Sequence, residues 1–354
     1  MEVIKRLKEE EKKLRERLKG HCQWGSKQKE ALQYKIQVIG QLIKIYQVAP
    51  TPLDLSAAKK ILDQQAGLDK TKELLLEKVE IAEYQRRENV KTSSQVLCLA
   101  GPPGTGKTTL AFNFAQAWGK QFFRLALGGL SETSFLVGTS EGSGGSEVGQ
   151  LARALVETGK PDPVIVFEEI DKTGSPFKSA LLDCLVAILD PVQNHEILDH
   201  YLNVKLDFSR VTFIVTANDL KKIPSYLRSR FLLIELPGYN FQQKQEIARQ
   251  IIHQKFRFAE NNCEITSAAL ETLINKTREK GVRQLEQVLN IIFERCCLLT
   301  WARETKPDEE KSKIIIDTNL VNQTIPNTLP SVDEEVDQAL SPLGKIQNSV
   351  AGNP

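Results

Sequence analysis

The stretch of this sequence that decides its fold is Gly101-Pro102-Pro103-Gly104-Thr105-Gly106-Lys107-Thr108. It is a complete G-x-x-x-x-G-K-[ST] motif, and it lies between an apolar strand-like run, 96–100, and a helix-forming run, 109–118. Glycines let such a loop wrap with its backbone N–H groups pointing inward, at the positive end of the following helix. Phosphate oxygens bind to that arrangement. The sequence therefore predicts a nucleoside triphosphate site rather than a plain glycine-rich turn.

The polar side chains at the end of this motif predict the cofactors. The Lys107 ammonium is expected to reach the β and γ phosphates, and the Thr108 hydroxyl is expected to hold Mg²⁺. ATP and Mg²⁺ are therefore the predicted cofactors. The residues expected to surround the nucleotide phosphates are Gly101, Pro102, Pro103, Gly104, Thr105, Gly106, Lys107, Thr108 and Thr109.

Two carboxylates, Glu168 and Glu169, follow the apolar strand-like run 163–167. In P-loop ATPases the first carboxylate at this place supports Mg²⁺ and the second polarises the attacking water. Glu169 is therefore the predicted general base, and Glu168 is the predicted metal ligand. Glu168 stands where Asp is usual, and its extra methylene can shift the metal site and slow hydrolysis. The alternative for Glu168 is an acid at a helix N-terminus, where the helix dipole favours it.

Further polar residues follow later strands. Asn218 comes after the strand-like run 211–216, where an amide can orient the attacking water, although Asn also suits turns. Arg228 and Arg230 precede another strand, and Arg283 opens a helix. An arginine near the γ phosphate offsets charge that develops in the transition state. Taken singly, an arginine of this kind is more often a surface charge than a catalytic group.

The order of the predicted elements indicates an α/β fold. Short apolar strands alternate with helices from residue 95 to residue 238, which is typical of a parallel sheet with crossover helices. Helices are predicted before this region and, as a second all-helical domain, after it. The segment 128–149 is polar and rich in Gly and Ser. The run 314–317 is predicted to be either a strand or the start of a helical turn. Residues 326–354 are expected to form a disordered tail. The predicted strands are 96–100, 122–127, 163–167, 211–216 and 232–236.

The first helix, 1–20, carries Ile4, Leu7, Leu14 and Leu18 at a spacing like that of a coiled coil. Two heptads are too few for a stable coiled coil on their own, so this helix is expected to seek a partner or to be solvated. Its many lysines and arginines are nearly balanced by glutamates, which favours a charged, solvated face over a nucleic-acid site.

Composition excludes several classes of protein. The 354 residues predict about two to three domains, and 47 Lys+Arg against 45 Asp+Glu give a net charge of +2, which makes no case for nucleic acid. No apolar run approaches the roughly 20 residues that cross a bilayer, and the N-terminus lacks the apolar core of a signal peptide. The six cysteines have no metal-like spacing. These features predict a cytoplasmic protein with no membrane partner.

Taken together, these residues make the chain resemble the ATPase module of Lon proteases, which belong to the AAA+ class. The similarity runs from about Leu53 to Leu320. The stretches that carry it are Ile61-Leu62-Asp63, Gly67-Leu68, Leu127-Gly128-Gly129, Glu169-Ile170-Asp171-Lys172, Leu189-Asp190-Pro191-Val192-Gln193-Asn194, Asp199-His200-Tyr201-Leu202, Pro237-Gly238-Tyr239 and Gly281-Val282-Arg283.

This resemblance implies an architecture and a set of roles. It implies a three-layer αβα AAA+ domain at 53–238, preceded by a helical segment at 1–52 and followed by a small all-α lid domain at 239–325. Asn218 would be sensor 1, Arg230 the arginine finger that reaches a neighbouring subunit, and Arg283 sensor 2. A finger that acts on a neighbour implies a homo-oligomeric ring, which is a hexamer in the family. The residues implied to line the adenine pocket are Gly67, Leu68, Tyr239, Ile247 and Val282.

The sequence also departs from the Lon pattern. The residues after Ile325 contain no Ser/Lys catalytic motif, so peptidase activity is not expected, and the family's N-terminal substrate domain has no counterpart. An ungapped count from Gly128-Gly129 places the substrate-gripping aromatic–aliphatic pair at Ser143-Gly144, where no ring is available. If a local insertion hides the true position, Phe135 is the nearest aromatic residue.

Three functions are consistent with these features. The first is a ring-forming Lon-like ATPase that remodels or unfolds a protein client. The second is a slowly hydrolysing, nucleotide-dependent assembly switch, which the altered pore loop and Glu168 favour. The third is the ATPase part of a split or truncated Lon protease: either the peptidase is on another polypeptide, or the chain is a truncation of a longer Lon. DNA binding stays open for a Lon-type ring, although the net charge does not support it.

Overall fold

The computed structural model describes residues 2–20, 26–49, 51, 54–63, 65, 67–88, 96–130, 132–140, 146–173, 178–255, 263–304 and 313–325. The chain divides into two compact units. The first, here called the sheet unit, comprises Met1–Ala100 and Lys107–Glu235; the second, the helical unit, comprises Gly101–Gly106 and Leu236–Pro354. Among the described residues, none of the helices combines the length and the apolar character that crossing a bilayer requires. The predicted disordered tail at 326–354 lies outside the described residues.

The sheet unit is built around a five-stranded sheet in the order β2-β3-β6-β1-β7. Every pair of neighbouring strands in it is parallel, with Leu97 opposite Ile214 on one side and opposite Leu232 on the other. The central strands are buried along nearly their whole length, because helices cover both faces of a parallel sheet. The strands are β1 (Val96–Ala100), β2 (Phe122–Ala126), β3 (Val164–Glu168), β6 (Thr212–Ala217) and β7 (Phe231–Glu235).

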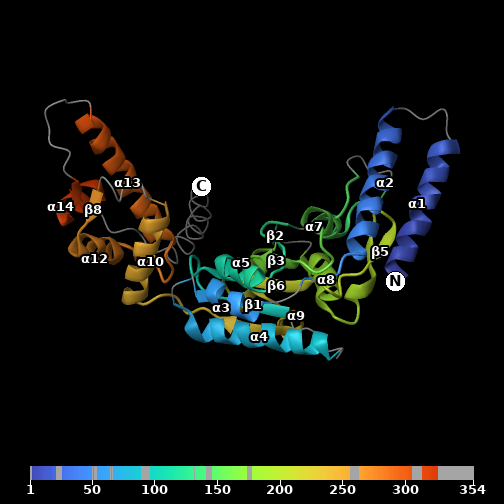
Figure 1. Cartoon of the computed structure of the whole chain (residues 1–354), viewed down its shortest axis with the longest axis horizontal. Coiled ribbons are helices and arrows are strands. Elements are labelled where there is room, and N and C mark those ends of the chain that lie inside the picture. Colours follow the sequence, from blue (N-terminus) through green and yellow to red (C-terminus); the bar gives the residue numbers. More distant parts are fainter. Residues whose placement is uncertain are drawn as a thin grey trace, which may run out of the picture. The chain divides into compact units, whose positions relative to one another are not determined.

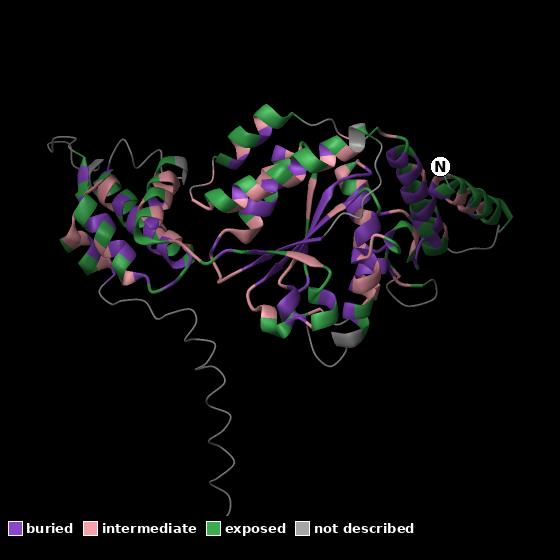
Figure 2. Ribbon diagram, turned by 90° about the horizontal axis from the view of Figure 1, so that it is seen from below, coloured by how far each residue is buried: buried purple, intermediate pink, exposed green. Residues whose placement is uncertain are grey.

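Helices lie on both sides of this sheet, and its three central strands, β3, β6 and β1, are almost wholly buried (Figure 2). The helix α5 contacts β2, β3 and β6, whereas α7 contacts β2. The predicted three-layer αβα architecture is therefore confirmed. The helices of these layers are α3 (Leu55–Asp63), α4 (Asp69–Arg87), α5 (Lys107–Ala117), α7 (Gln150–Thr158), α8 (Lys178–Leu189) and α9 (Ser225–Arg228).

The first helix finds its partner inside the chain. The helices α1 (Glu2–Gly20) and α2 (Ser26–Tyr46) lie side by side in the sheet unit (Figure 1). Leu7 and Leu14 are fully buried, and Arg6 forms an ion pair with Glu196. The apolar spacing of the first helix therefore serves an intramolecular helix pair and not a solvated helix.

Two short features of the sheet unit were missing from the sequence-based prediction. The strands β4 (Ile197–Asp199) and β5 (Val204–Leu206) form an antiparallel hairpin. The one-turn helix α6 (Ser134–Val137) interrupts the polar segment 128–149. These elements of three or four residues are shorter than the stretches over which hydrophobic periodicity can be recognised, about 4–8 residues for a strand and 11 or more for a helix.

The helical unit has its own apolar core, in which Leu273, Leu289 and Ile292 are fully buried. The expectation that this unit is all-helical is wrong in one detail, because β8 (Cys263–Ile265) and β9 (Ile314–Ile316) form a parallel pair. Of the two alternatives for 314–317, the strand is therefore the correct one for Ile314–Ile316. The helices of this unit are α10 (Phe241–Lys255), α12 (Ser267–Lys276), α13 (Arg283–Glu304) and α14 (Thr318–Thr324).

Candidate nucleotide site

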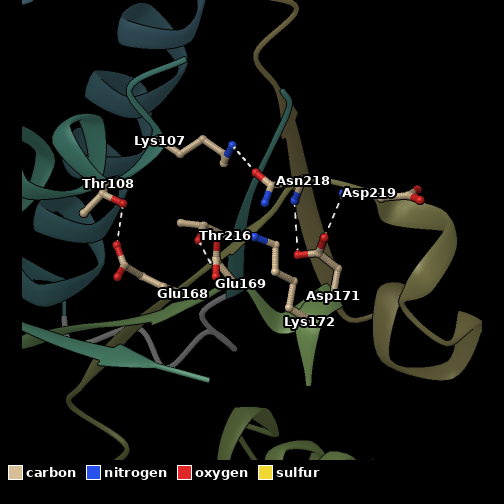
Figure 3. Close-up of polar contacts among 9 residues, drawn as sticks. All are labelled: Lys107, Thr108, Glu168, Glu169, Asp171, Lys172, Thr216, Asn218 and Asp219. Carbon is tan, nitrogen blue, oxygen red and sulfur yellow. Dashed lines mark hydrogen bonds and ion pairs between the residues drawn. The ribbon is translucent and has the colours of Figure 1, made fainter. Parts of the chain in front are cut away.

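The predicted site residues of the sheet unit gather at one edge of the sheet. The strands β3, β6 and β1 are neighbours and parallel, so their carboxyl ends lie at the same edge. Glu168 ends β3, Asn218 directly follows β6, and Lys107 begins α5 after the loop that leaves β1. Figure 3 shows these side chains converging from three elements. Ligands bind at this edge in open α/β sheets.

Lys107 and Asn218 face one another in this site. The Lys107 Nζ donates a hydrogen bond to Asn218 Oδ1 at 2.8 Å (Figure 3). Burial lowers the pKa of Lys107 to about 8, while the negative charges of Asp171 and Glu169 oppose this shift. An ammonium and an amide held together at a sheet edge provide two polar groups that suit the phosphates of a nucleotide and a nearby water.

Thr108 and Glu168, the predicted Mg²⁺ ligands, lie next to one another. The Thr108 hydroxyl donates to Glu168 Oε1 at 2.5 Å, so the two predicted ligands are in contact. Hydroxyl and carboxylate oxygens are the donors that Mg²⁺ prefers. The described residues contain no group of three or more His, Cys, Asp or Glu side chains that could hold a metal ion by itself. The pair therefore fits an ion that takes its other ligands from phosphates and water.

The second oxygen of Glu168 has a different neighbour. Glu168 Oε2 lies 3.4 Å from the Nε of Arg124, which comes from the adjacent strand β2. The Arg124 side chain is 61% exposed and that of Glu168 only 15%, so the ion pair lies at the margin of the site. The guanidinium thus gives the Glu168 carboxylate a second partner besides the Thr108 hydroxyl.

Glu169, the predicted base, has an unusual backbone conformation. Its φ is 56°, in the left-handed region that a non-glycine residue seldom adopts. The Lys172 Nζ donates to Glu169 Oε1 at 2.8 Å, and a β-carbon added at Gly128 would lie 3.0 Å from the other oxygen, Oε2. The Glu169 side chain is 46% exposed and the Lys172 side chain is 53% exposed, so water reaches this ion pair. The carboxylate is thus accessible and has a cation beside it.

The P-loop residues Gly101–Gly106 belong to the helical unit by their contacts. Gly104 has a φ of 74°, which favours glycine, and its carbonyl oxygen accepts the N–H of Val282 at 3.0 Å. The Tyr239 hydroxyl donates to the carbonyl oxygen of Thr105 at 2.9 Å. A β-carbon added at Gly281 would overlap the backbone of Pro103. The turn before α13 therefore packs directly against the P-loop backbone.

Comparison with known proteins adds to this geometry. The family model described as "ATPase family associated with various cellular activities (AAA)" matches residues 97–238. A Lon protease of Desulfovibrio desulfuricans is 42% identical over 246 residues, which are 68% of this chain and 28% of that protein. A Lon protease of Lawsonia intracellularis is 36% identical over 297 residues, 82% of this chain and 34% of that protein.

The chain is a Lon-like AAA+ module. Similarity extends to eukaryotic relatives: "Lon protease homolog 2, peroxisomal" of Arabidopsis thaliana is 35% identical over 306 residues, 85% of this chain and 33% of that protein. The aligned part of the Lon-like module thus spans between 28% and 34% of the length of these three relatives.

The residues predicted to line the adenine pocket of the Lon-like module are divided between the two units. Gly67 and Leu68 lie in the sheet unit, just before α4, whereas Tyr239, Ile247 and Val282 lie in the helical unit. The two groups belong to different units, so the adenine pocket stays a prediction. Thr109 is exposed on the first turn of α5. Ser143 and Gly144, the predicted pore-loop pair, lie outside the described residues.

The two predicted catalytic arginines of the Lon-like module also lie in different units. Arg230 Nη1 is 2.7 Å from Asp190 Oδ2, and Asp190 in turn accepts the N–H of Val192. The pKa of Asp190 is lowered by that backbone hydrogen bond and by its bond with Arg230. Arg283 begins α13 in the helical unit. Their roles as arginine finger and sensor 2 stay predictions.

Sequence analysis of the Lon-like module overlooked Asp171. This residue lies in the 3-10 turn η1 (Ile170–Lys172), is 5% exposed, and accepts the backbone N–H groups of Asn218 and Asp219. The run Glu169-Ile170-Asp171-Lys172 resembles Lon, but the sequence pattern assigns no role to Asp171. The sequence offers one signal, an acid two residues after the predicted base, and the backbone that Asp171 holds, just after β6, is remote in the sequence.

Proposed function

We propose that this Lon-like AAA+ module binds Mg·ATP and hydrolyses it. One observation carries the proposal: Lys107, Asn218 and Glu169 lie with the Thr108–Glu168 pair at the shared edge of β1, β3 and β6. The AAA family match over residues 97–238 supports it independently.

The side chains divide the work of hydrolysis. Lys107 would neutralise phosphate charge, and Asn218 would orient the attacking water through its amide. Glu169 would accept a proton from that water as the new bond to phosphorus forms, which is general-base catalysis. When bound, Mg²⁺ supplies further charge neutralisation at the phosphate oxygens. Thr108 and Glu168 would hold the ion.

We further propose that the module works as a homo-oligomeric ring, in which Arg230 reaches the nucleotide of a neighbouring copy and the energy of hydrolysis remodels a protein client. The similarity to Lon proteases supports the ring. The ion pair with Asp190 supports a defined position for Arg230. Six copies, a cytoplasmic location and Arg283 as sensor 2 belong to the same proposal.

The test is steady-state Mg·ATP hydrolysis by the intact chain, measured with and without unfolded casein. Glu169→Gln keeps the size of the side chain and removes its basicity, so turnover is expected to fall by at least 100-fold while nucleotide binding is retained. Glu157→Gln makes the same change at an exposed position of α7 and serves as the matched control. Stimulation by casein would support a remodelling motor. Full turnover in Glu169→Gln would overturn the assignment of the base.

Two contacts favour a second candidate, a slowly hydrolysing assembly switch. Arg124 offers Glu168 a partner at 3.4 Å, and Lys172 holds Glu169 at 2.8 Å, so both carboxylates have cations that compete with their catalytic tasks. A switch would assemble with ATP and stay assembled for many minutes. Assembly in light scattering that decays at the rate of ATP turnover would favour the motor.

The similarity to Lon proteases favours a third candidate, in which the module is the ATPase part of a split or truncated Lon protease. In a split protease, the peptidase would be on another polypeptide. Purification of the untagged chain from its source, followed by a casein-degradation assay, tests this. Degradation that depends on ATP and on a co-purifying chain would support it.

A further inference from the structure

Asp171 is a buried carboxylate to which the hydrolytic roles above assign no task. It is only 5% exposed, and both of its oxygens are occupied. Oδ1 accepts the N–H of Asn218 at 3.1 Å, and Oδ2 accepts the N–H of Asp219 at 3.1 Å (Figure 3). A side chain that follows β3 thereby holds the backbone that follows β6.

A second contact joins the same two segments. The N–H of Glu169 donates to Thr216 Oγ1 at 3.2 Å, and Thr216 is 2% exposed on β6. The paired register of β3 and β6 ends at Phe167 and Val215. Beyond that point the backbone ladder stops. Thr216 and Asp171 then supply side-chain hydrogen bonds that continue the connection between the two strands.

These contacts act on the two residues that must cooperate around the attacking water. Glu169 has a φ of 56°, a conformation that persists only where surrounding contacts determine it. Asn218 extends its side chain from a backbone held by Asp171 and receives the Lys107 ammonium at its Oδ1. The relative position of the base and the amide therefore depends on this bridge.

We propose that Asp171 is a positioning residue for hydrolysis, which fixes Asn218 relative to Glu169. The proposal rests on the proposed ATPase function. Asp171 would act through the Asn218 backbone, without touching the nucleotide. Its loss would displace the water-orienting amide, while the P-loop would still bind ATP. The expected signature is a fall in kcat with little change in KM.

The test compares Asp171→Asn with the wild type in steady-state ATPase assays over a range of ATP concentrations. Asparagine has the same shape but keeps only one accepting oxygen, so one of the two backbone N–H groups loses its partner. A misplacement of about 1 Å costs about 100-fold in rate, so we expect kcat to fall by about 10- to 100-fold. KM should stay within about threefold, because the P-loop residues are unchanged.

Asp199→Asn provides a matched control. Asp199 lies in the same unit, is 3% exposed, and also accepts two backbone N–H groups, from Gly149 at 2.9 Å and Leu202 at 2.8 Å. Its substitution should lower the melting temperature about as much as Asp171→Asn does, and should leave basal kcat within about twofold of the wild type. Of these two variants, only Asp171→Asn should lower kcat as well as the melting temperature.

Thr216→Val tests the bridge from the other strand. Valine keeps the shape of threonine and removes the oxygen that accepts the Glu169 N–H, so kcat should fall again with KM unchanged. If Asp171→Asn does not fold, the kcat of Thr216→Val tests the positioning role in its place. Wild-type kcat in either folded variant, or an equal loss in Asp199→Asn, would overturn the positioning role alone. No turnover by the wild type would overturn the proposed function and the positioning role with it.

Discussion

Gly281 is the point where the turn before α13 touches the P-loop backbone. A β-carbon added there would lie 2.3 Å from the carbonyl oxygen of Pro103 and 2.5 Å from the carbonyl carbon of Gly104. Both neighbours are backbone atoms, so no side-chain rotation relieves the overlap. We therefore expect Gly281→Ala to displace the P-loop from the conformation that binds phosphate.

The size of the effect follows from these distances. Carbon atoms pack at about 3.5–4.0 Å, so the added methyl group overlaps its neighbours by about 1 Å. Overpacking of this kind costs about 1–3 kcal/mol. Where the P-loop moves to relieve it, that free energy is lost from ATP binding, and the Kd rises about 5- to 150-fold at 1.4 kcal/mol per factor of ten. Loss of the 3.0 Å hydrogen bond from Val282 to Gly104 acts in the same direction.

The assay is a titration with a fluorescent ATP analogue in the presence of Mg²⁺, with thermal melting of each variant measured in parallel. Gly40→Ala is the control, because Gly40 lies within α2 and an added β-carbon would have no atom within 4 Å. This control should bind ATP like the wild type and gain up to about 1 kcal/mol in stability, since Ala favours a helix. A Gly281→Ala protein that binds within twofold of the wild type would refute the reasoning.

Three further substitutions have expected outcomes. Tyr239→Phe removes only the hydroxyl that donates to the Thr105 carbonyl oxygen at 2.9 Å. The same titration should then show a Kd for ATP that is higher by about 2- to 12-fold. An unchanged Kd would mean that the P-loop does not need this hydrogen bond. Glu168→Asp draws the carboxylate back by about 1.5 Å from the threonine hydroxyl of the P-loop. The Mg²⁺ concentration that gives half-maximal turnover should therefore rise several-fold. Faster turnover instead would favour the slowly hydrolysing assembly switch. Burial lowers the pKa of Lys120 from 10.5 to about 8, so the folded chain binds fewer protons than the unfolded chain between these values, and the free energy of unfolding should rise with pH across that window. In thermal melts at pH 7.5 and 9.5, Lys120→Met should lack this rise, and an equal rise in both proteins would contradict the reasoning.

Much of the sheet unit was predictable, because its signals are local. The five apolar runs predicted as strands all fall within a residue or two of β1, β2, β3, β6 and β7. The helix-forming run 109–118 that follows the glycine-rich motif coincides with α5, Lys107–Ala117, to within two residues. Buried parallel strands are nearly continuous apolar runs, and the helices between them show their own period, so neighbouring residues contain the necessary information.

Other features depend on partners that are distant in the sequence. The strands β8 and β9 contain three residues each and pair across 48 intervening residues, from Cys263–Ile265 to Ile314–Ile316. The first helix has an apolar spacing that indicated some partner, but only the fold identified α2 as that partner. Short strands and helix pairs are stabilised mainly by tertiary contacts, so local sequence does not specify them.

The sequence by itself determined the phosphate-binding loop, the α/β class and the candidate carboxylates, since each of these is a short motif next to an element with a clear period. Only the tertiary structure brought Lys107 to Asn218 and Thr108 to Glu168, across separations of 111 and 60 residues. It also decided that Asp171 bridges β3 and β6 and that Glu169 adopts a left-handed backbone. The physical reason is that hydrogen bonds between the ends of neighbouring strands depend on strand order, and strand order is a property of the whole folded sheet.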